Sequence, residues 1–146
     1  MDTSYPNTQL FINGHWKDAA AKETIDVINP ATESVIGQMA HARKEDLDEA
    51  LDAANLSFQK WKNVNSFDRY KILRKAAEII RQRSNEIARI MTIEHGKPIG
   101  ESLAEVNLGA DITDWLAEEA RRAYGRLIPS RSTDVYQMVV KEPVGP

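Results

Sequence analysis

The residue types that carry most enzyme chemistry are sparse in this chain. Its 146 residues contain no cysteine, which excludes a cysteine nucleophile, a disulfide and a thiolate metal site within it. The three histidines, His15, His41 and His95, stand too far apart for a metal-binding spacing, and we read them as surface or turn residues. The chain also lacks a glycine-rich phosphate loop, an HExxH zinc motif and a nucleophile elbow. Residue types and spacing therefore predict no catalytic site.

The most informative local stretch is Glu94-His95-Gly96-Lys97-Pro98. Gly96 follows a helical run, where a glycine closes the helix in a left-handed conformation because it has no Cβ to clash. Pro98 then suits the first turn of a following helix, where its missing N–H is not needed. We therefore expect a tight corner that ends one helix and begins the next.

Short apolar runs separated by turn residues predict a small β-layer near the amino terminus. Asn13-Gly14 lies between residues 10–12 and 15–17, and Asn-Gly between apolar runs is a strong hairpin signal because a type I′ turn needs positive φ. Residues 25–28 and 35–40 read as two further strands. The polar residues 1–8 read as a mobile end.

Apolar residues at spacings of three and four predict three long helices. The first runs from about residue 44 to 62 without a clear N-cap. The second covers 67–94, with Ser66 as its N-cap, and Ser84 leaves open whether it is one helix or two. The third runs from Pro98 to about residue 124, and Gly125 closes it. This helix carries two lines of apolar residues. One is Leu103, Val106 and Ala110, and the other is Leu108, Ile112 and Leu116. Two apolar lines predict that the helix is buried on two sides. Residues 126–134 then read as a loop and 135–141 as a strand.

Composition restricts the class of protein. The chain is 42% hydrophobic and 28% charged, which is typical of a globular protein. Its net charge of −3 argues against a nucleic-acid or membrane-surface partner, so we read the basic run at residues 69–83 as a solvated helix face. No stretch approaches the roughly 20 apolar residues of a membrane span. Because the first residues show no signal pattern, we expect a cytoplasmic protein.

Several motifs occur together in a particular order. They are Leu10-Phe11-Ile12-Asn13-Gly14-His15-Trp16, Val27-Ile28-Asn29-Pro30-Ala31-Thr32, residues 54–61, residues 69–77, Glu94-His95-Gly96-Lys97-Pro98, Glu105, Trp115-Leu116-Ala117-Glu118-Glu119-Ala120, residues 125–129, and Lys141-Glu142-Pro143-Val144-Gly145. This succession resembles the amino-terminal part of the NAD(P)-dependent aldehyde dehydrogenase superfamily. Residues 115–129 resemble the succinate-semialdehyde dehydrogenase branch most closely.

The resemblance implies an α/β fold, of which this chain is a mostly helical fragment with a small amino-terminal β-layer, three long helices and a carboxy-terminal strand. Residues 9–134 would form the amino-terminal part of the Rossmann-like cofactor-binding domain. Residues 135–146 would begin the oligomerisation arm.

The resemblance also implies a function for the parent enzyme, which is the oxidation of an aldehyde such as succinate semialdehyde to the acid with NAD or NADP. In the family the nucleophilic cysteine, the general base and most cofactor-binding residues would lie beyond Pro146. This chain would therefore hold no catalytic or cofactor-binding residue and would be an inactive scaffold by itself. Its partners would be the remainder of the parent dehydrogenase, a small aldehyde substrate and further copies in a homo-oligomer, with no nucleic acid and no membrane.

Two binding roles follow from the resemblance alone. Gly109 would border the substrate tunnel. The carbonyls of Val27 and Ile28 with the Glu94 carboxylate match a monovalent-cation site of some relatives, since hard cations prefer oxygen ligands. The simpler interpretation is that Glu94 is solvated near a helix end. The alternative to the enzyme fragment as a whole is a free-standing helical protein-interaction module.

Overall fold

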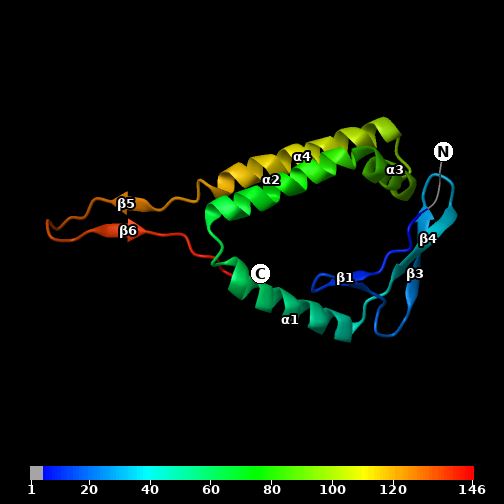
Figure 1. Cartoon of the computed structure of the whole chain (residues 1–146), viewed down its shortest axis with the longest axis horizontal. Coiled ribbons are helices and arrows are strands. Elements are labelled where there is room, and N and C mark those ends of the chain that lie inside the picture. The colour runs from blue at the N-terminus through cyan, green and yellow to red at the C-terminus, as the bar shows by residue number, and fades with distance from the viewer. Residues whose placement is uncertain (1–4) are drawn as a thin grey trace.

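The computed structural model describes residues 5–146, and within them it contains six strands and four α-helices. Residues 1–4, half of the expected mobile end, lie outside the described residues. Two helices, α2 and α4, lie side by side along the long axis, with α3 at one end and the β3–β4 sheet beyond it (Figure 1). The strands β5 and β6 extend away from the opposite end as a long arm (Figure 1).

The first two strands form the hairpin that Asn13-Gly14 predicts. Strand β1 (Leu10–Ile12) pairs antiparallel with β2 (His15–Lys17), and the turn residues have φ values of 51° and 81°. Both values are positive, as a type I′ turn requires. The hairpin stands apart from the next sheet, so the expected β-layer consists of two separate two-stranded sheets.

The second sheet pairs β3 (Thr24–Asn29) with β4 (Ser34–Ala40) in antiparallel register. The register shifts between Val27, which lies opposite Gly37, and Ile28, which lies opposite Val35. Thr8 adds a parallel bridge on the other edge of β4, because its N–H donates to the Gln38 carbonyl at 2.9 Å. Residues 5–8 of the expected mobile end therefore include a segment that is hydrogen-bonded to this sheet.

Helix α1 (Lys44–Trp61) begins where the periodicity predicts, and a residue inside its first turn caps it. The Asp46 carboxylate accepts the backbone N–H groups of Arg43 and Ala20, each at 2.9 Å. These two hydrogen bonds lower the pKa of Asp46. Only 2% of the surface of Asp46 is exposed to solvent. Asp46 thus joins the start of α1 to the segment that follows β2.

The second predicted helix is two helices in the structure. Helix α2 (Ser66–Gln82) and helix α3 (Ser84–His95) are separated at Arg83. Asn65 caps α2 in place of Ser66, because its Oδ1 accepts the Asp68 N–H at 3.0 Å. The division lets α3 turn away from α2 toward the β3–β4 sheet (Figure 1).

Helix α4 (Ile99–Ala120) is shorter than predicted, and the segment after it differs from the expectation. Gly125 does not close the helix in a left-handed conformation, since its φ is not positive. The expected loop includes strand β5 (Arg126–Ile128), which pairs antiparallel with β6 (Gln137–Val139). Gly125 is needed for this hairpin instead, because a Cβ there would lie 2.2 Å from the Val139 carbonyl oxygen.

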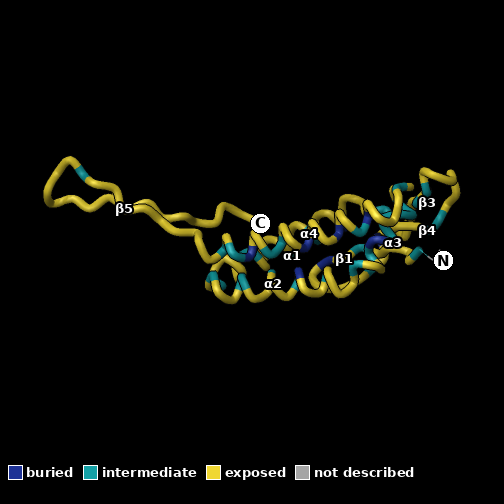
Figure 2. The backbone as a smooth tube through the Cα atoms, turned by 90° about the horizontal axis from the view of Figure 1, so that it is seen from above, coloured by how far each residue is buried: buried dark blue, intermediate teal, exposed yellow. Residues whose placement is uncertain are grey.

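The core is thin and is made largely of small side chains. Ala77 of α2, Ala88 of α3 and both Ala110 and Ala117 of α4 are fully buried. Small residues at such contacts allow helices to approach closely. Ile12, Ala19 and Asp46 are buried as well, outside the paired helices. The arm is exposed along almost its whole length (Figure 2). No helix in residues 5–146 is long and apolar enough to cross a bilayer.

Candidate functional site

The corner between α3 and α4 is the first candidate region, and its geometry follows from Gly96. Gly96 has a φ of 69° and donates its N–H to the Thr92 carbonyl at 2.9 Å, so it ends α3 as predicted. A Cβ at Gly96 would lie 3.0 Å from the Ala31 nitrogen and 3.1 Å from the Pro30 ring. The corner therefore packs directly on the turn that follows β3.

The other end of the corner differs slightly from the prediction. Pro98 is the N-cap of α4, with an extended ψ of 141°, rather than a residue of its first turn. Lys97 forms an ion pair with Glu105 in the second turn of α4, and this contact lowers the pKa of Glu105. Ser102 of α4 is fully buried and its hydroxyl lies 2.8 Å from that of Thr92 on α3. Side chains of both α3 and α4 thus stabilise the corner.

The elements that carry the predicted cation ligands lie in contact. Helix α3, which carries Glu94, packs against β3, which carries Val27 and Ile28. The half-buried Glu94 carboxylate accepts a hydrogen bond from the Tyr5 hydroxyl. Burial and this bond raise the pKa of Tyr5. None of the ion pairs between residues 5–146 involves Glu94, and the monovalent cation itself remains a prediction.

The contact of Tyr5 with Glu94 is not predictable from the sequence. The hydrogen bond joins residues that are 89 positions apart, and nothing in the polar first residues marks a contact with a distant helix end. The only local signal is an aromatic residue in an otherwise polar segment.

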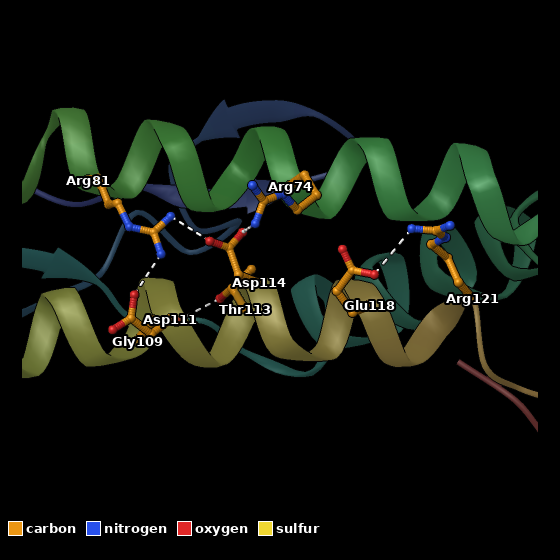
Figure 3. A network of polar contacts seen from close by, with 8 residues as sticks. All are labelled: Arg74, Arg81, Gly109, Asp111, Thr113, Asp114, Glu118 and Arg121. Carbon is orange, nitrogen blue, oxygen red and sulfur yellow. Dashed lines mark hydrogen bonds and ion pairs between the residues drawn. The ribbon is translucent and has the colours of Figure 1, made fainter.

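A second candidate region is the polar seam between α2 and α4 (Figure 3). The Arg81 Nη2 atom lies 2.7 Å from Asp111 Oδ1, and its Nη1 atom lies 2.7 Å from Asp114 Oδ2. The Arg74 Nη1 atom lies 2.9 Å from Asp114 Oδ1. The two carboxylates raise the pKa of Arg81. The Asp114 Oδ1 atom is buried without a well-directed hydrogen bond, so its contact with Arg74 is an ion pair only.

The seam continues toward the end of α4. The Arg121 guanidinium lies 3.2 Å from Glu118 and stacks over the rings of Phe67 and Tyr70 at 4.8 and 5.0 Å. Such cation–π contacts favour a fixed position for the guanidinium. The basic run on α2, which we expected to be a solvated face, is therefore in part engaged with α4 through Arg74 and Arg81.

Gly109 lies on the exposed side of α4, and a Cβ there would meet nothing within 4 Å. Its carbonyl accepts the Thr113 hydroxyl at 2.8 Å, as Figure 3 shows beside the seam. This open surface is compatible with a passage beside the helix. The tunnel assignment of Gly109 remains a prediction.

Neither candidate region contains a cluster of metal-binding side chains among the described residues. No group of three or more histidine, aspartate or glutamate side chains that could hold a metal ion lies together within residues 5–146. The link from β4 to α1 contains no glycine, so this strand-to-helix connection does not form a glycine-rich phosphate loop. The contacts of the two candidate regions join helices to one another and to the β3–β4 sheet, so both regions are suited to positioning helices.

Comparison with known proteins identifies similar chains. The model of the aldehyde dehydrogenase family matches residues 16–146. Succinate-semialdehyde dehydrogenase [NADP(+)] from Escherichia coli is 35% identical over 144 residues, which are 99% of this chain and 30% of that protein. Glutarate-semialdehyde dehydrogenase from Pseudomonas putida is 37% identical over 137 residues, which are 94% of this chain and 28% of that protein.

The fold has equally clear counterparts among solved structures. Succinate-semialdehyde dehydrogenase from Burkholderia pseudomallei superimposes with a TM-score of 0.91 at 31% identity, over 95% of this chain and 29% of that one. The chain thus spans less than a third of the length of the relatives that it matches.

Proposed function

This chain belongs to the aldehyde dehydrogenase family, and from that premise we propose that it forms the amino-terminal scaffold of an NAD(P)-dependent enzyme that oxidises succinate semialdehyde. The observation that supports a scaffolding role is the unequal coverage. The E. coli relative matches 99% of this chain, while the match takes in only 30% of that relative. Most of the enzyme therefore has no counterpart in these 146 residues.

The chemistry of aldehyde oxidation supports the same division. The reaction needs a nucleophile that adds to the carbonyl, donors that stabilise the resulting oxyanion, and a bound nicotinamide that accepts hydride. This chain has no cysteine. We assign the reacting groups to the rest of the parent enzyme and assign to this chain the positioning of α2, α3 and α4.

The names of the relatives support a substrate class. Relatives at 35–37% identity are named for succinate semialdehyde, glutarate semialdehyde and 3-sulfolactaldehyde. All three compounds are small aldehydes with an anionic group elsewhere in the molecule. Succinate semialdehyde is our first choice because both an E. coli and a rice relative are named for it, at 35% and 38% identity. We propose that Gly109 leaves space beside α4 for such a molecule to pass.

Two exposed parts of the fold suggest the partners, namely one side of α4 and the arm. The rest of the parent dehydrogenase would cover the exposed side of α4. The arm formed by β5 and β6 has a free edge on β6, and an unpaired strand edge readily pairs with another chain. We therefore propose that residues 135–146 begin an arm that joins copies in a homo-oligomer.

The isolated chain should not oxidise succinate semialdehyde. The assay mixes it with the aldehyde and NAD+ or NADP+ and follows the absorbance of the reduced cofactor. The E. coli relative, assayed in parallel, shows that the conditions support turnover. Turnover by the isolated chain above a buffer blank would contradict the scaffolding role.

A further inference from the structure

We propose that residues 5–8 form a strap whose Tyr5 hydroxyl satisfies the Glu94 carboxylate in place of a cation, and so ties the β3–β4 sheet to the end of α3. This inference does not depend on the proposed function. The contact is one that the sequence does not predict. In it, the Tyr5 hydroxyl takes the place beside Glu94 where the resemblance predicts a cation.

The strap is attached along the edge of β4 by hydrogen bonds. The Thr8 N–H donates to the Gln38 carbonyl at 2.9 Å, and the Ala40 N–H donates to the Thr8 carbonyl at 2.8 Å. The Asn7 side chain accepts the Gln38 N–H at 3.1 Å. Three directed hydrogen bonds thus align the segment with the edge of the sheet. This alignment places Tyr5 beside the last turn of α3.

The Tyr5 ring lies against the β3–β4 sheet at Gly37. A Cβ on Gly37 would be only 2.4 Å from Tyr5 Cδ1, so the ring rests directly on the glycine. Gly37 is paired in the sheet with Val27, one of the predicted cation ligands. The phenol ring therefore covers the sheet beside the position expected for the cation, while its hydroxyl reaches Glu94.

The position of Glu94 makes its negative charge unfavourable without a partner. Glu94 is in the last turn of α3, where the helix dipole disfavours a negative charge. A half-buried carboxylate at that position needs a hydrogen-bond donor or a positive charge. Among the ion pairs between residues 5–146 none involves Glu94, and within these residues the Tyr5 hydroxyl donates to its carboxylate. A cation would need several oxygen ligands at once, and one Glu94 oxygen is already engaged.

The test measures thermal unfolding of the 146-residue chain and its variants in KCl, NaCl and choline chloride at equal concentration. Tyr5→Phe should lower the unfolding midpoint by about 4 °C or more, since a hydrogen bond to a charged group is lost. Glu94→Leu removes the acceptor, so Tyr5→Phe should have little further effect in that background. The wild-type midpoint should be the same in all three salts. Tyr136→Phe is the matched control, because Tyr136 is 88% exposed, and it should leave the midpoint unchanged.

Hydrogen exchange supplies a second readout that does not need a cooperative melt. Tyr5→Phe should speed exchange at the amides of Thr8 and Ala40 and leave the Gly96 amide unchanged. A wild-type midpoint that rises in KCl or NaCl but not in choline chloride, and loses this response in Glu94→Leu, would overturn the proposal in favour of a cation site. Unchanged exchange and an unchanged midpoint in Tyr5→Phe would overturn it as well.

Discussion

Gly96→Val should lower the free energy of unfolding by about 1–3 kcal/mol, since a β-branched residue resists the left-handed conformation. Gly96 has a φ of 69°, which valine adopts only with strain. A Cβ there would also lie 3.0 Å from the Ala31 nitrogen and 3.1 Å from the Pro30 ring, both in the turn after β3. The substitution should therefore loosen the junction of α3, α4 and the sheet together.

Denaturant unfolding of the two proteins measures this effect. Gly100→Val is the matched control, because a Cβ at Gly100 meets nothing within 4 Å and its φ is not positive. Helix α4 should tolerate that change, since glycine is a poorer helix former than valine. If Gly96→Val unfolds at the same denaturant concentration as the wild type, then the corner is not held as described.

The isolated chain should self-associate and bind a hydrophobic dye. One of the two apolar lines on α4 is bare, since Leu108, Ile112 and Leu116 are 58%, 51% and 56% exposed. The arm adds Tyr136 and Met138, which are 88% and 73% exposed. A contiguous apolar patch beyond a few hundred Å² is unusual on a soluble monomer. The rest of the parent enzyme would cover these faces in the proposed assembly.

Light scattering over a concentration series, with dye fluorescence in parallel, measures association. Two variants separate the surfaces. Leu108→Gln combined with Ile112→Gln should reduce dye binding, and Met138→Lys should weaken edge pairing by the arm. A stable wild-type monomer that binds no dye would indicate a complete domain. It would favour the alternative of a free-standing interaction module.

The features that the sequence predicts well are those with local causes. The Asn13-Gly14 turn and the Gly96 corner each depend on the conformation of one or two residues, and the structure confirms both. The apolar spacing also places the start of α1 at Lys44. For the candidate site, the corner and the contact of α3 with β3 could be anticipated, the first from local residues and the second from the resemblance.

The features that the sequence does not predict depend on distant partners. Strand β5 is short and exposed, and its strand character comes from pairing with β6, so residues 126–128 read as loop. The role of Gly125 is set by the Val139 carbonyl across the same hairpin. Asp46 and Tyr5 act on groups 26 and 89 positions away. No periodicity marks such contacts.

The most direct test of the central claim is a hybrid enzyme in which this chain replaces the matching 30% of the E. coli relative. The measurement is the rate of cofactor reduction with succinate semialdehyde, with the isolated chain as the control. If these residues are the scaffold of such an enzyme, the hybrid should oxidise the aldehyde while the isolated chain shows no turnover. A hybrid that folds and binds NADP+ but does not oxidise the aldehyde would contradict the account.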